Sequence, residues 1–141
     1  MSFEINDLRT DKKMETEGVW VDEIGGMRLK IARLENPDYQ RFIARKSKPF
    51  RRQIARGNIE AVSEKMNDVI IEAFARYILL DWKNLTEKGK AIKYTYENAC
   101  RILGIKDFFE IVEYHAKNAE LFKQEIREES VKNLPAASNG S

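Results

Sequence analysis

The stretch from about residue 58 to residue 82 constrains the fold most strongly, because its apolar side chains recur every three or four residues. That spacing puts them on one side of an α-helix, where they form a continuous stripe that needs a partner surface. We therefore predict that the longest helix of the chain covers about 59–82. The stripe consists of Ile59, Val62, Met66, Val69, Ile70, Ala73, Phe74, Tyr77 and Ile78.

A second stripe of helical spacing predicts another long helix over about 107–132. Asp107 and Glu110 stand three residues apart at its start, where such a pair can cap the free N–H groups of the first turn. The stripe consists of Phe108, Ile111, Val112, His115, Ala119, Phe122 and Ile126.

Shorter helices are predicted around these two. Asn36-Pro37-Asp38 combines a capping residue, a proline and an acid, which together favour the start of a helix. Pro49 is expected to interrupt that helix, so that a second short helix covers 49–56. We expect residues 83–94 to form a loop and residues 96–103 to form a helix, which Thr95 starts and Gly104 ends.

Near the N-terminus the apolar period changes from helical spacing to strict alternation. Met27, Leu29 and Ile31 alternate with basic residues, which is typical of a half-buried strand. Gly25-Gly26 precedes this strand and suits a tight turn with positive φ angles, so we predict a β-hairpin over about 19–31. A lone hairpin leaves strand edges that another subunit can cover, which predicts self-association.

These elements predict a mainly α protein, a small helical domain with one N-terminal β-hairpin. The domain is expected to cover 18–133, between a flexible N-terminal segment at 1–17 and a disordered tail at 134–141. A chain of 141 residues is long enough to bury a core without a disulfide or a metal.

Charge and cysteine content narrow the class of function. The net charge of +2 gives the whole chain no strong attraction to nucleic acid or to an anionic membrane. The single cysteine, Cys100, excludes an internal disulfide, and no apolar run approaches the ~20 residues that span a bilayer. We therefore expect an intracellular protein, without contact to a membrane.

Catalysis is not expected from the residues available. The single histidine, His115, lies in the predicted apolar stripe, and Cys100 sits among apolar neighbours, so both are interpreted as structural. One histidine and one cysteine do not make a zinc site, and no glycine-rich phosphate loop is present in the sequence. We expect no enzymatic activity, no metal and no cofactor.

The segment 41–56 carries the one strong charge anomaly, because it contains seven basic residues and no acid. Arginines with interleaved aromatic rings can bind an acidic protein surface, and this interpretation includes pairing within the chain. A solvated surface and a nucleic-acid site remain as alternatives. The candidate partner-binding residues are Arg41, Phe42, Arg45, Phe50, Arg52 and Arg56.

The order of features over residues 18–133 resembles the tail assembly chaperones of long-tailed (siphophage-type) bacteriophages. The resemblance rests on the hairpin ending in 27–33, on Lys48-Pro49-Phe50-Arg51-Arg52, on Asp81-Trp82 within 75–85 and on Tyr94-Thr95-Tyr96-Glu97-Asn98-Ala99. It implies a protein of the host cell cytoplasm that binds the phage tape measure protein, keeps it soluble, promotes polymerisation of the tail-tube protein around it, and is absent from the mature virion. The alternative from another class is a small nucleic-acid-binding regulatory protein that uses residues 41–56.

Overall fold

The computed structural model describes residues 1–123, with five α-helices and two small antiparallel sheets in that part of the chain. The two sheets make this a mixed α/β fold, so the prediction of a mainly α protein with a single hairpin is wrong. The elements are a 3₁₀-helix η1 (Ile5–Leu8), α1 (Lys12–Glu17), β1 (Val19–Ile24), β2 (Met27–Ile31), α2 (Pro37–Ala55), α3 (Ile59–Tyr77), β3 (Leu79–Lys83), β4 (Thr86–Glu87), β5 (Lys90–Ala91), α4 (Tyr96–Leu103), α5 (Lys106–Lys117) and a 3₁₀-helix η2 (Ala119–Phe122).

The predicted β-hairpin is confirmed as β1 and β2, and its turn has positive φ at both glycines, 58° at Gly25 and 92° at Gly26. The sheet then continues onto a third strand, because β3 pairs antiparallel with β2 in the order β1-β2-β3. Leu29 lies opposite Trp82 in this pairing, and both side chains are buried.

The third strand explains why the long central helix is shorter than predicted. α3 ends at Tyr77, and the residues from Leu79 onward, expected to continue it, form β3. Ile78, Leu79 and Leu80 make an apolar run that suits a helix or a buried strand equally well. The run forms a strand here because the backbone N–H and C=O groups of β2 supply the hydrogen-bond partners that the backbone of β3 needs.

α5 is likewise shorter than the predicted helix. It ends at Lys117, and the Asn118 side chain then accepts a hydrogen bond from the Glu120 N–H at 3.1 Å, which starts η2. The predicted cap is also wrong, since Ile105 occupies the N-cap position without a side-chain hydrogen bond. The remaining predicted residues, 124–132, and the predicted tail at 134–141 lie outside the described residues.

Three further predictions have clear outcomes. The helix over 96–103 is confirmed as α4, with the Thr95 hydroxyl accepting a hydrogen bond from the Asn98 N–H at 3.0 Å. The expected loop over 83–94 contains β4 and β5, which form the second sheet. Pro49 does not end a helix, because α2 runs continuously through it.

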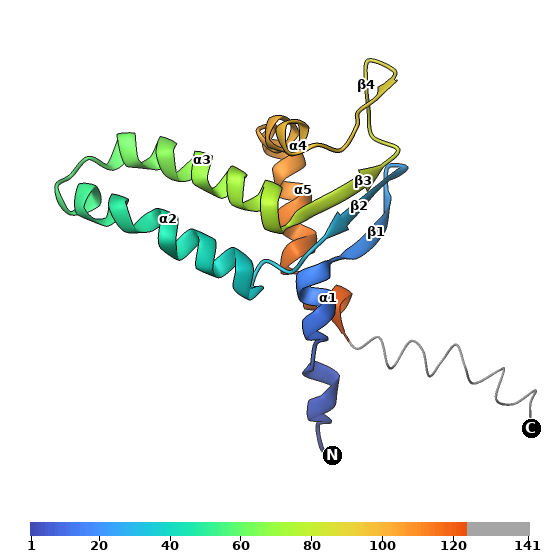
Figure 1. The fold of residues 1–141 in the computed structure, drawn as a ribbon. Coiled ribbons are helices and arrows are strands. Elements are labelled where there is room, and N and C mark those ends of the chain that lie inside the picture. Colours follow the sequence, from blue (N-terminus) through green and yellow to red (C-terminus); the bar gives the residue numbers. More distant parts are fainter. Residues whose placement is uncertain (124–141) are drawn as a thin grey trace, which may run out of the picture.

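The core lies where the three-stranded sheet meets α3, α4 and α5 (Figure 1). The inward faces of β2 and β3 contribute Leu29, Ile31, Leu79 and Trp82, all of which are buried. Trp82 donates a hydrogen bond from its indole Nε1–H to the Ile92 carbonyl at 2.6 Å, and Tyr94 donates one to the Leu79 carbonyl at 2.7 Å. These two hydrogen bonds anchor the start and the end of the β4–β5 hairpin to the core, and the exposed hairpin itself projects from the body (Figure 1).

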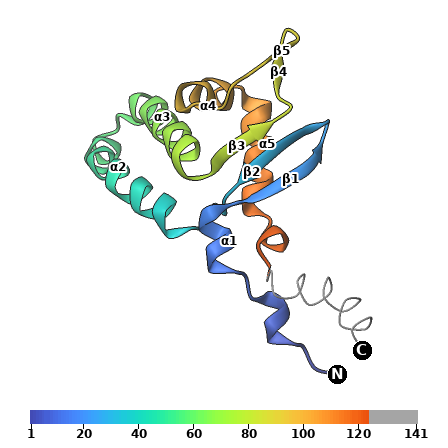
Figure 2. The same ribbon diagram turned by 45° about the vertical axis from the view of Figure 1, so that its right-hand side comes forward.

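The segment 1–17, which the sequence predicts to be flexible, contains η1 and α1. It is attached to the body through Glu15, a buried carboxylate that pairs with the Arg33 guanidinium and accepts a hydrogen bond from the Thr10 hydroxyl at 2.9 Å. The Asp11 N–H also donates to the Phe122 carbonyl at 2.7 Å. Residues 10–11 therefore meet the end of the described chain at 122–123, and the N-terminus extends from there away from α2 and α3 in the two views (Figures 1 and 2).

Candidate functional site

Helices α2 and α3 form an antiparallel pair that projects from the body, and we call residues 37–77 the arm (Figure 1). The base of the arm is packed: the rings of Phe42 and Tyr77 lie 5.4 Å apart between their centroids, and α4 covers α3 nearby. Toward the tip, where Gly57 reverses the chain with a φ of 88°, most side chains are exposed. The arm is therefore a two-helix layer with wide solvent-facing surfaces.

The sequence explains why α2 forms as one helix. Asn36 caps it by accepting a hydrogen bond from the Tyr39 N–H at 3.0 Å, and Pro37 supplies a suitable φ in the first turn. Pro49 has no N–H for the Arg45 carbonyl, but its side chain is exposed, so the ring meets no packing conflict with α3. Phe42, which contacts Tyr77, and the half-buried Phe50 lie on the side of α2 that packs on α3. This packing stabilises α2 as one continuous helix across Pro49.

Five cations follow one another along α2 at three- and four-residue steps, and we call them the basic stripe. All five are exposed, and this spacing keeps them on one side of the helix. The half-buried and buried positions Phe42, Phe50 and Gln53 define the side that faces α3, so the basic stripe points away from α3. The stripe consists of Arg41, Arg45, Lys48, Arg52 and Arg56.

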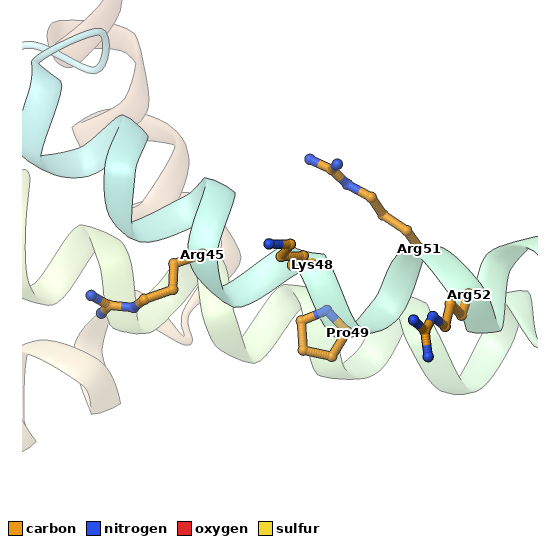
Figure 3. A pocket seen from close by; sticks show the side chains of 5 residues that line it. All are labelled: Arg45, Lys48, Pro49, Arg51 and Arg52. Carbon is orange, nitrogen blue, oxygen red and sulfur yellow. The ribbon is translucent and has the colours of Figure 1, made fainter.

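Part of the basic stripe borders an open hollow of about 650 Å³ on the surface of α2 (Figure 3). Arg45, Lys48, Arg51 and Arg52 line the hollow together with the Pro49 ring. Four cations around one hollow give a concentrated positive field, which attracts carboxylates or phosphates.

The predicted partner-binding residues divide into two groups in the structure. Arg45, Arg52 and Arg56 are exposed on the basic stripe, and Arg41 joins them while also pairing with Asp38 at 2.5 Å. Phe42 is only 4% exposed inside the arm, with the Arg45 guanidinium 5.4 Å from its ring centroid. Phe50 is half-buried on the same side. The structure thus gathers the four arginines on the outer face and places the two rings at the α2–α3 contact.

Two features of the arm were missed at the level of sequence. Lys48 and Arg51 line the hollow beside the predicted arginines. Both belong to the same basic run of the sequence, which could have indicated that they share the site. Exposed acids at four-residue steps also follow α3, on the side turned away from its α2-facing residues Val62 and Met66. We call this set the acidic stripe; it consists of Glu60, Glu64 and Asp68.

The tip of the arm adds exposed apolar surface. Ile54 near the end of α2 is 51% exposed, and Ile59 at the start of α3 is 61% exposed. The two residues flank the turn around Gly57, so they lie at the end of the arm that is most remote from the core. Apolar side chains beside a charged stripe are typical of a surface that contacts another macromolecule.

His115 lies on a different face, in a hollow of about 380 Å³ that Ile24, Ile111 and Tyr114 help to line. Burial lowers the pKa of its imidazole below the ordinary value of 6.5, so the ring is neutral at physiological pH. Its buried Nδ1 has no hydrogen-bond partner among the described residues. Asp107 and Glu110 also line the hollow.

Two properties of the described residues bear on other classes of function. In residues 1–123, no group of three or more His, Cys, Asp or Glu side chains is placed to hold a metal ion. None of the helices in this part of the chain combines the length and the apolar character needed to cross a bilayer.

Comparison with known proteins gives one positive result. No curated protein and no solved structure matches the chain significantly. The family described as YdaY prophage protein matches residues 34–133, a range that includes the whole arm, β3, α4 and α5. Because this match covers well over half of the 141 residues, the chain belongs to the YdaY prophage protein family and is derived from a phage.

Proposed function

We propose that this protein is a phage tail assembly chaperone, which binds the tape measure protein in the host cell cytoplasm, keeps it soluble and promotes tail-tube polymerisation around it. The observation that carries the proposal is the projecting arm, with its exposed basic stripe and its exposed isoleucines at the tip. The phage origin of the chain and its resemblance to tail assembly chaperones supply the identity of the client. The proposed role is binding, without catalysis, and the chaperone leaves before the virion is mature.

The arm supplies two kinds of contact that suit a long helical client. The exposed face of α2 runs for about 22 Å between Arg41 and Arg56, at about 1.5 Å of rise per residue, which matches four turns of a helix laid alongside it. Exposed cations on this face would speed association with acidic client residues. Ile54 and Ile59 would bury apolar client residues at the tip and slow dissociation.

Co-expression with the tape measure protein of the same phage tests the proposal. Wild-type protein should keep the client soluble, whereas the variant with Arg45→Glu, Arg52→Glu and Arg56→Glu should leave most of it in the pellet. The matched control reverses three exposed cations elsewhere, Lys13→Glu, Lys90→Glu and Lys93→Glu, and should behave as wild type. If the arm variant folds normally and solubilises the client fully, the basic stripe does not bind it.

A nucleic-acid-binding role is the second candidate, and the four cations around the α2 hollow favour it. Phosphate binding releases counterions, so affinity for single-stranded DNA should fall by at least about tenfold between 50 and 200 mM salt if several phosphates are held. The same arm variant would then lose DNA binding while it still solubilised the tape measure protein. Salt-independent or absent DNA binding by the wild type would exclude this candidate.

A further inference from the structure

The arm carries opposite charges on its two outer sides. The basic stripe lies on the side of α2 that faces away from α3, and the acidic stripe lies on the side of α3 that faces away from α2. Within residues 1–123 no ion pair joins the two stripes, and the pairs that do form at the arm, Arg41–Asp38 and Arg76–Glu72, lie near its base. The charges toward the tip are therefore placed to meet charges of another molecule.

The two stripes also match in height along the arm. Phe42 and Tyr77 are in ring contact, so they mark equivalent levels of the two antiparallel helices. Ten residues further along α2 is Arg52, and ten residues back along α3 is Asn67, the neighbour of Asp68. Fourteen residues along is Arg56, and fourteen back is Ser63, the neighbour of Glu64. Each offset is one residue, or about 1.5 Å.

From this match we infer that the arm docks against the arm of a second copy of this chain, with the basic stripe of one copy on the acidic stripe of the next. The arms then lie side by side with their tips pointing the same way, so that Arg52 faces Asp68 and Arg56 faces Glu64 of the neighbouring copy. α4 packs on α3, and the junction of α4 with α5 reaches as far as Asn67, where Leu103, Gly104 and Lys106 line a shared hollow. Glu60, Glu64 and Asp68 nevertheless remain exposed for this contact.

The contact uses different surfaces on the two copies. Each pairing leaves a free basic stripe on one copy and a free acidic stripe on the other, so further copies can add in the same way until a ring closes or a filament grows. A single exposed ion pair contributes little, but two pairs in register act together and disfavour a neighbour shifted in height. This inference goes beyond the proposed function, and it predicts that the client and a neighbouring copy compete for the basic stripe.

Charge exchange between the stripes tests the inference with the purified full chain and without any client. One variant carries Arg52→Glu and Arg56→Glu, a second carries Glu64→Lys and Asp68→Lys, and a third carries all four substitutions. Sedimentation velocity at 50 mM salt should show association of the wild type, which 500 mM salt weakens. Each double variant should raise the apparent dissociation constant at least about tenfold, because like charges then face each other.

Restoration of binding distinguishes this contact from a general effect of charge. The fourfold variant should associate within about threefold of the wild type, and an equimolar mixture of the two double variants should form complexes that neither forms alone. The control pair Lys13→Glu and Lys90→Glu should change the dissociation constant less than about twofold. Circular dichroism checks that each variant is folded. A monomeric wild type at 50 mM salt, an oligomer that the double variants leave intact, or a folded fourfold variant as weak as the double variants would each overturn the inference.

Discussion

Glu15 links the N-terminal segment to the body, although a carboxylate that is only 5% exposed is costly to bury alone. Burial raises the pKa of this carboxyl, but hydrogen bonds from Arg33 and Thr10 and the Arg33 charge outweigh it, so the pKa lies below the ordinary value of 4.5. Because the folded state holds the ionised form more strongly than the unfolded state does, the carboxylate stabilises the fold above about pH 4.5. That contribution is lost as the pH falls through the lowered folded-state pKa.

We expect Glu15→Gln to lower the free energy of unfolding by about 2 kcal/mol at pH 7, because the Arg33 guanidinium loses its charged partner. Urea denaturation at pH 7 and at pH 3.5 measures the effect, and the gap between wild type and variant should shrink at the lower pH. Glu17→Gln, at an exposed position of the same helix, is the control and should change stability by less than about 0.5 kcal/mol. An equal gap at both pH values would contradict the role of the Glu15 charge.

Gly18 joins α1 to β1 at a point where a side chain has neither the backbone freedom nor the space it needs. Its φ is +83°, and an added Cβ would lie 2.9 Å from Leu80 Cδ1 and 3.2 Å from the Ile31 carbonyl oxygen. We expect Gly18→Ala to destabilise the protein by about 2–3 kcal/mol, from backbone strain and steric overlap together. Gly25→Ala has a positive φ but open space, so thermal unfolding should show a loss of only about 1 kcal/mol for that control. Equal losses of stability at the two positions would show that the Leu80 side chain moves aside without a cost in free energy.

At the scale of the element, α2 is a helix with a proline in its middle. Replacing Pro49 by alanine supplies an N–H for the Arg45 carbonyl and removes the ring, so Pro49→Ala should raise the free energy of unfolding by about 1–3 kcal/mol. Thermal melts measure the change, and hydrogen exchange should slow at the amides of residues 49–55. Lys48→Ala, at the neighbouring exposed position, is expected to have an effect below about 0.5 kcal/mol. A destabilised Pro49→Ala variant would mean that the proline shapes α2 for packing.

The elements that the sequence predicts correctly are those with local determinants. Gly25-Gly26 defines the hairpin by its backbone freedom, and Thr95 and Gly104 bound α4 by capping and by a helix-ending residue. β3 could not be predicted in the same way, because its partner β2 lies about 50 residues earlier in the chain and the run at Ile78-Leu79-Leu80 fits either structure.

The candidate site was predictable in its charge and not in its geometry. The basic run over 41–56 is evident in the sequence, and the helix sorts its residues into the outer stripe and the packed side. Phe42 was expected to face a partner, but position in the sequence does not show which side of α2 meets α3, and the ring packs on Tyr77. The acids of α3 recur every four residues, much as the cations of α2 recur every three or four. That the two sets lie on opposite outer sides of the arm is evident only when the two helices are placed side by side.

In the whole molecule, the burial of side chains falls from the body to the tip of the arm. Ala73, Phe74 and Ala75 of α3 are buried in the core, whereas every residue from 54 to 61 is exposed. Segments with few buried apolar contacts open at a lower free energy than the global unfolding transition. The two parts of α3 therefore differ in local stability.

We predict that amides in residues 54–62 exchange with solvent at least about tenfold faster than those in residues 70–76 under native conditions. Native-state hydrogen exchange followed by mass spectrometry or NMR resolves the two regions. The measurement belongs at a protein concentration low enough to keep copies apart, since an associated arm would be protected. Uniform protection along α3 in the monomer would show that the arm unfolds only together with the core.

The arm leaves and rejoins the body at one place. The Ala32 N–H donates to the Ile78 carbonyl at 2.8 Å, just before α2 begins and just after α3 ends. Phe74 and Ala75 at the base of the arm belong to the core, whereas every residue at the tip, from 54 to 61, is exposed. One helical turn added to both helices at the tip would therefore move the tip outward by about 5.4 Å and leave the base as it is. The length of the arm can therefore differ among relatives of this chain without a change in the body that carries it.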